Sequence, residues 1–103
     1  MDKIYPRRKL ATEIEFLKQQ GKVVGFANGC FDLIHVGHVR YLTDARAHCD
    51  VLVVALNTDE SVRRIKGKGR PLVPLDERME VLEAFACVDR ITWFDEPTVA
   101  ETL

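Results

Sequence analysis

The chain has 103 residues and a formal charge of −1, with 47% hydrophobic and 30% charged residues. These values fit one globular domain, exclude a disordered chain, and give no general attraction toward nucleic acid. No apolar run approaches the roughly 20 residues of a membrane-spanning helix, and the first residues lack a secretory signal. The three cysteines form no CxxC pair, which favours reduced thiols. We therefore expect a cytoplasmic protein with neither a membrane nor a nucleic-acid partner.

Apolar periodicity predicts helices and strands in alternation. The predicted elements are a helix over 7–20, a strand over 22–28, a helix over 37–48, a strand over 51–57, a helical turn at 58–60, a basic loop over 63–70, a helix over 74–86, a strand over 88–94 and a helix beginning near Pro97. The segment 51–57 is apolar throughout, as in a parallel strand buried on both faces. This order predicts an α/β fold, a Rossmann-like three-layer sandwich with a parallel sheet.

Polar residues cluster after the first two predicted strands. The loop after the first strand contains His35 and His38, and the sequence RRIKGKGR over 63–70 follows the second. Because the carboxyl ends of parallel strands meet at one edge of a sheet, we expect these segments to lie together and to bind a ligand.

The residue types in these segments point to a phosphate-bearing ligand. Gly29 permits a tight turn, and Gly37 opens a helix whose free N–H groups favour an anion. His35 and His38 are three residues apart, so both can donate hydrogen bonds to one anion. The lysines and arginines of 63–70 add positive charge. We therefore expect phosphoryl or nucleotidyl transfer, which depends on charge neutralisation and positioning.

Other chemistries fit the same residues less well. Asp32, His35 and His38 are possible zinc ligands, but no fourth ligand is evident, so we predict no metal site formed by side chains. Cys30 lacks an activating partner for a nucleophile, and we expect its backbone N–H to face a phosphate. Aromatic residues do not alternate with the charges of 63–70, which disfavours nucleic-acid binding. Neither GxxxxGK[ST] nor GxGxxG is present.

The stretch NGCFDLIHVGHVRYL resembles the GxFDxxHxGH signature of the cytidylyltransferase-like nucleotidyltransferases. The matching residues are Gly29, Phe31, Asp32, His35, Gly37 and His38. Within that family, the sequence over 57–91 is most similar to the adenylyltransferases that make ADP-heptose from heptose 1-phosphate. The resemblance runs from Arg8 to the last residue and implies the HUP-type nucleotidyltransferase fold.

The resemblance also implies substrates and roles. ATP would bring Mg²⁺, a sugar phosphate would attack the α-phosphorus, and pyrophosphate would leave. The implied catalytic residues are His35, His38 and Lys66. The nucleotide-binding candidates are Asn28, Gly29, Cys30, Phe31, Asp32, Gly37 and Arg78, and the substrate-binding candidates are Asn57, Asp59, Lys68 and Arg70. For Arg78, pairing with neighbouring acids on its own helix is the alternative.

Members of this family usually continue through a further strand, a glycine-containing loop and a Ser/Thr-rich turn that binds the nucleotide, which these 103 residues lack. We therefore expect a single nucleotidyltransferase domain over 1–103 that is incomplete at its C-terminus. An open sheet edge would favour a homo-oligomer. The alternatives are a cytidylyltransferase acting on glycerol 3-phosphate or a similar polyol phosphate, and a nucleotide-binding module without turnover. A class I aminoacyl-tRNA synthetase fragment would require a much longer chain.

Overall fold

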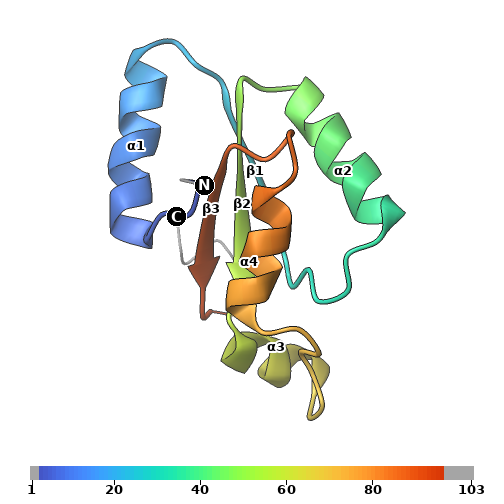
Figure 1. The fold of residues 1–103 in the computed structure, drawn as a ribbon. Coiled ribbons are helices and arrows are strands. Elements are labelled where there is room, and N and C mark those ends of the chain that lie inside the picture. Colours follow the sequence, from blue (N-terminus) through green and yellow to red (C-terminus); the bar gives the residue numbers. More distant parts are fainter. Residues whose placement is uncertain (1–2, 97–103) are drawn as a thin grey trace.

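The computed structural model describes residues 3–96 (Figure 1). Its elements are α1 (Arg7–Gln19), β1 (Val24–Gly29), α2 (Val36–Ala47), β2 (Val51–Asn57), α3 (Asp59–Lys66), α4 (Leu75–Glu83) and β3 (Arg90–Phe94). The predicted order of helices and strands is confirmed within this range, with element ends shifted by a few residues. The helix predicted to begin near Pro97 lies outside the described residues.

The three strands form a parallel sheet with the order β1-β2-β3. β2 lies in the centre, where Val51 pairs with Val24 of β1 and Val53 pairs with Arg90 of β3. Every residue of β2 is buried. This confirms the prediction that the continuous apolar run over 51–57 is an internal parallel strand.

Helices cover both faces of the sheet. Leu42 of α2 and Leu82 of α4 belong to one buried cluster with Leu52 and Leu56 of β2. Successive side chains of a strand point to opposite faces, so the buried Val53 faces the other side. α1 lies on that side and contacts β1 and β3 (Figure 1). The predicted α/β three-layer arrangement is therefore confirmed.

The two edges of the sheet differ. Ile4 forms a parallel bridge with Ile91 of β3, and Tyr5 N–H donates a 2.8 Å hydrogen bond to the carbonyl of Ile91. This short addition to the sheet was not predicted, because it is too brief to show periodicity. Within residues 3–96, no strand pairs with the outer edge of β1. No helix of this range is long and apolar enough to cross a membrane.

The predicted loop over 63–70 is wrong in its first half, because α3 continues to Lys66. The hydroxyl of Thr58 caps the helix by accepting a hydrogen bond from the first turn, and the cations of 63–66 lie in the last turn, where the helix dipole favours them. Gly67 then ends the helix with φ +95°, a conformation that glycine adopts readily. Lys66 therefore extends from the end of a helix.

Candidate active site

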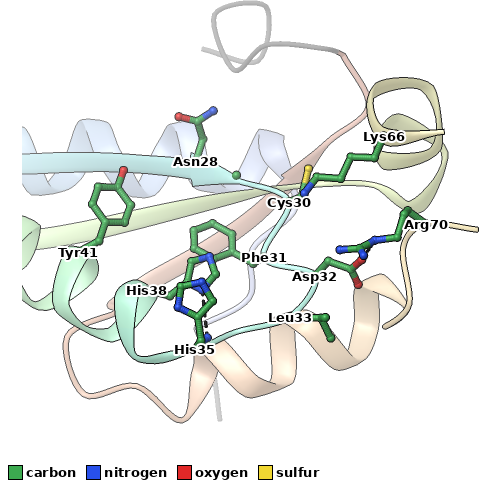
Figure 2. Close-up of a pocket in the computed structure, with 11 residues that line it drawn as sticks. Asn28, Cys30, Phe31, Asp32, Leu33, His35, His38, Tyr41, Lys66 and Arg70 are labelled. Atoms are coloured by element: carbon green, nitrogen blue, oxygen red, sulfur yellow. Dashed lines mark hydrogen bonds and ion pairs between the residues drawn. The ribbon is translucent and has the colours of Figure 1, made fainter.

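A cavity of about 560 Å³ lies beside the end of β1. It is lined by Asn28, Gly29, Cys30, Phe31, Asp32, Leu33, His35, His38, Tyr41, Lys66 and Arg70 (Figure 2). The structure thus brings together most of the residues that the sequence analysis selected, including all three catalytic candidates. They come from the end of β1, the β1–α2 loop, the first half of α2, the end of α3 and the loop that follows it.

His35 and His38 are held by a reciprocal arrangement at the start of α2, here called the histidine turn (residues 35–38). The Nδ1 atom of His35 accepts a 3.0 Å hydrogen bond from Gly37 N–H. The Nδ1 atom of His38 accepts a 3.1 Å hydrogen bond from His35 N–H. Both rings therefore cap the helix, and their centroids lie 4.3 Å apart.

This capping determines which ring nitrogens can meet a ligand. Because both Nδ1 atoms accept backbone hydrogen bonds, each neutral imidazole carries its proton on Nε2. Burial lowers the pKa of His38, and the nearby charges of His35 and Lys66 lower it further. His38 is therefore a neutral Nε2–H donor at pH 7. The two rings offer neighbouring donors, as one phosphate group requires.

Gly37 does not offer a free N–H group to an anion, in contrast to the prediction. Its N–H is not free for a ligand, because it donates to His35. A Cβ atom at this position would lie 2.6 Å from Cε1 of His35. Glycine is needed here because the imidazole of His35 packs directly over the backbone of the first helical turn.

The chain between β1 and the histidine turn takes an unusual course at Phe31. This residue has φ +50°, a left-handed conformation that is uncommon outside glycine. Its ring is buried and lies 5.3 Å from the ring of His38, centroid to centroid. A Cβ on Gly29 would approach the Phe31 ring to 3.2 Å, so the ring would have to shift to admit a larger residue. Phe31 thus packs against His38 and lines the same cavity.

The cavity has two chemically different ends. Lys66 and Arg70 lie at one end, and Figure 2 shows Tyr41 at the opposite end, with the histidines between. Sequence reasoning missed Tyr41 and Leu33. Tyr41 follows His38 by three residues on α2, so helical spacing from the histidine was the available signal.

Asp32 lies under the cationic end, and its side chain is only 1% exposed. Its carboxylate accepts hydrogen bonds from Leu72 N–H (2.8 Å) and Val73 N–H (2.9 Å) and forms a 2.7 Å ion pair with Arg70. Burial alone would raise the pKa of Asp32, but the two amides and the guanidinium outweigh it and lower the pKa below 3.8. Asp32 therefore stays ionised and holds the basic segment, residues 66–73.

The structure does not bring Arg78 to the cavity, in contrast to the prediction. Its side chain is 0% exposed, and it donates to the backbone carbonyls of Cys30 (2.6 Å), Asn57 (2.8 Å) and Val73 (2.9 Å). It also forms a 2.6 Å ion pair with Asp59, which lies on α3 and not on its own helix. Arg78 thus joins the ends of β1 and β2 to α3 and to the segment before α4.

Three substrate-binding candidates also lie away from this cavity. Asn57 is buried at the end of β2, where its amide donates to Ser61 Oγ (2.9 Å). Asp59 and Arg70 help line a second, smaller cavity of about 330 Å³. Lys68 is exposed and lines neither cavity. Of these candidates, Arg70 alone touches both spaces.

The side chains around the cavity do not form a metal cage. Across residues 3–96 there is no group of three or more His, Cys, Asp or Glu side chains that could hold a metal ion. The carboxylate of Asp32 is occupied by Arg70 and backbone amides, and both histidine Nδ1 atoms are occupied by the helix start. The arrangement suits an anion that meets Nε2–H donors and cations.

Comparison with known proteins finds similar sequences and folds. Residues 26–101 match the Cytidylyltransferase-like family. The chain is 48% identical over 101 residues to the bifunctional protein HldE of Syntrophotalea carbinolica, covering 98% of this chain and 21% of that protein. It is 55% identical over 97 residues to HldE of Citrifermentans bemidjiense, covering 91% of this chain and 20% of that protein.

A solved structure has a similar fold. The lipopolysaccharide core biosynthesis protein from Thermoplasma volcanium GSS1 superposes with a TM-score of 0.70 at 32% sequence identity, covering 80% of this chain and 66% of that one. The present chain spans about a fifth of the length of the curated relatives named above.

Proposed function

The chain belongs to the cytidylyltransferase-like family of nucleotidyltransferases, and on that premise we propose that its cavity carries out adenylyl transfer from ATP to a sugar 1-phosphate. The observation that carries this proposal is the pair of histidines that cap α2. Their ring centroids lie 4.3 Å apart, and they share one cavity with Lys66 and Arg70. Two imidazole N–H donors next to two cations match the charge distribution of a triphosphate undergoing substitution.

In the proposed reaction, an oxygen of the sugar phosphate attacks the α-phosphorus of ATP. A new P–O bond forms, the bond to the β-phosphate oxygen breaks, and pyrophosphate leaves with the electron pair. Nε2–H of His35 and His38 donate to phosphate oxygens as negative charge builds there. Lys66 and Arg70, at the cationic end, neutralise charge on the phosphates. No side chain forms a covalent intermediate.

We propose that Mg²⁺ enters with ATP. Mg²⁺ is commonly held by substrate phosphates and water with few protein carboxylates. This fits a cavity in which Asp32, the only acidic lining residue among residues 3–96, is already paired. When bound, the ion would neutralise phosphate charge. The chain's own residues would orient the triphosphate and donate hydrogen bonds.

For the acceptor, we propose heptose 1-phosphate. Support comes from the similarity of residues 57–91 to ADP-heptose-forming adenylyltransferases, from relatives named HldE, and from a structural neighbour named for lipopolysaccharide core biosynthesis. The name of the matched family favours one alternative, cytidylyl transfer to glycerol 3-phosphate or a similar polyol phosphate. A homo-oligomer and a cytoplasmic location stay predictions.

The test is pyrophosphate release by the complete protein. We expect release with ATP, Mg²⁺ and heptose 1-phosphate, and loss of release in His38→Ala. Release with CTP and glycerol 3-phosphate, but not with the first pair, would keep nucleotidyl transfer and overturn the substrates. ATP binding by calorimetry without product from either pair would identify a binding module without turnover.

A further inference from the structure

The ion pair between Asp32 and Arg70 is asymmetric in its burial. The carboxylate of Asp32 is 1% exposed, whereas the side chain of Arg70 is 34% exposed. The contact is made through Nε of Arg70, which is itself buried, 2.7 Å from Asp32 Oδ2. The Nε edge of the guanidinium is therefore held by an ion pair, while the side chain as a whole stays partly exposed and lines the cavity.

Asp32 cannot turn toward a ligand without breaking several contacts. Its carboxylate accepts hydrogen bonds from Leu72 and Val73, which lie 40 and 41 residues further along the chain. Val73 is held in turn by Arg78, whose Nε donates 2.9 Å to the Val73 carbonyl. The position of Asp32, and with it the position of Arg70, is thus fixed from two directions.

Arg70 lies at a boundary between two spaces. It lines the larger cavity with the histidines and the smaller cavity next to Asp59 and Arg63. In the part of the chain that the structure describes, Asp32 is the only acidic partner of Arg70. The terminal nitrogens of the guanidinium are therefore available to a phosphate, which arginine binds in a two-pronged geometry.

We propose that Asp32 is a positioning residue that acts through Arg70: it holds the Nε edge so that the terminal guanidinium nitrogens meet a substrate phosphate. This deepens the proposed function and rests on it. A long side chain normally loses rotamer freedom when it binds an anion, and a side chain already fixed loses less. Asp32 supplies that fixation without touching the nucleotide, in contrast to the nucleotide contact predicted from the sequence.

A double-mutant cycle in the complete protein tests this inference. Asp32→Asn keeps the shape of the side chain but removes its charge, and we expect it to lower kcat/KM by about 10-fold to 100-fold, the range that misplacement of a reacting or binding group produces. In an Arg70→Gln background, the same change should alter kcat/KM by less than about 2-fold, because coupled residues do not contribute additively. Arg70→Lys should recover little of the kcat/KM that Arg70→Gln loses, because lysine lacks the two-pronged geometry.

Two measurements separate positioning from folding. Amide hydrogen exchange at Leu72 and Val73 should speed up in Asp32→Asn and stay unchanged in Arg70→Gln, since the amides bond to Asp32 directly. Glu60→Gln removes an exposed carboxylate that pairs with Arg63 and Arg64, and this matched control should leave turnover unchanged. An equal loss from Asp32→Asn in both backgrounds would overturn the proposal.

Failure of the proposed adenylyl transfer can be distinguished from failure of the positioning role of Asp32. If the wild-type protein turns over none of the substrates, the same cycle is measured as affinity for inorganic triphosphate by calorimetry. Loss of affinity in Asp32→Asn that disappears in the Arg70→Gln background would support the positioning role without adenylyl transfer. Unchanged triphosphate affinity in both single variants would overturn it.

Discussion

The histidine turn and the basic segment line the same cavity but are held in different ways. The histidine turn is fixed by hydrogen bonds between residues two and three positions apart. The basic segment is held by Asp32, which lies 40 residues before Leu72, and by Arg78, which contacts Val73 five residues away and the carbonyl of Cys30 48 residues away. The first is therefore a local device of the helix start, whereas the second exists only when the whole sheet has formed.

This difference teaches which substitutions should affect activity and which should affect the fold. The histidines bond to exposed backbone at a helix start, so their loss should cost little stability. Arg78 and Asp32 lie beneath the cavity and saturate buried backbone groups. Loss of Arg78 should destabilise the ends of β1 and β2 beneath both parts of the site, whereas loss of Asp32 should loosen the basic segment alone.

The largest effect on stability is expected for Arg78→Met. The variant leaves the carbonyls of Cys30, Asn57 and Val73 without their donor. Breaking a buried charged network of this kind costs about 3–5 kcal/mol, measured as the free energy of unfolding in denaturant. The matched control is Arg8→Met on the exposed side of α1, for which a change within about 0.5 kcal/mol is expected. If Arg78→Met lowered the free energy of unfolding by less than about 1 kcal/mol, the inference that Arg78 joins the strand ends to α3 would be wrong.

Substitutions in the histidine turn should lower turnover far more than stability, unlike Arg78→Met. Asparagine is a good helix cap, so His35→Asn should keep the hydrogen bond from Gly37 while removing the Nε2–H donor. We expect turnover to fall by about 10²-fold to 10³-fold, as for removal of one transition-state donor, with little change in stability. His35→Ala should lose the same turnover and, in addition, about 1 kcal/mol of stability. Near-normal pyrophosphate release in His35→Asn would contradict the role of His35 as a phosphate donor.

The same difference in sequence separation explains what could be predicted from the sequence. The spacing of His35 and His38 and the apolar run of β2 are short-range patterns, and they correctly placed the histidines at a helix start beside the cavity and β2 inside the sheet. Gly37 was also placed at the helix start, but its N–H bonds to His35 instead of being free for an anion. The extension of α3 through Lys66 was missed because basic residues and glycines suggested a loop, whereas the Thr58 cap and the helix dipole favour a helix.

The roles of Arg78 and Asp32 could not be predicted from short-range sequence patterns. Arg78 contacts a carbonyl 48 residues away, and Asp32 contacts an amide 40 residues away. A charged residue near a predicted phosphate site is equally consistent with ligand contact and with a buried scaffold. Only the three-dimensional arrangement, in which the guanidinium of Arg78 has no exposed surface, distinguishes the two.

The smallest effect that separates the two regions is a difference in acid sensitivity. The pKa of His38 is lowered from 6.5, mainly by burial, so the unfolded state binds more protons than the folded state. Stability therefore falls as the pH drops from 6.5 toward the lowered pKa. The pKa of Asp32 is lowered from 3.8, because the Leu72 and Val73 amides and Arg70 outweigh burial, so its contribution is present above pH 3.8 and is lost as pH falls through the lowered value.

Thermal unfolding as a function of pH should therefore show two declines that belong to different regions. His38→Gln should reduce the decline just below pH 6.5, and Asp32→Asn should reduce the decline below pH 3.8. Asp95 provides a control, since hydrogen bonds from Thr58 and Arg64 lower its pKa but its side chain is 61% exposed. Solvent screens such a group, so Asp95→Asn should remove less of the acid decline than Asp32→Asn. Equal effects of these two variants would mean that the acid decline reflects carboxylates in general rather than the hold of Asp32 on the basic segment.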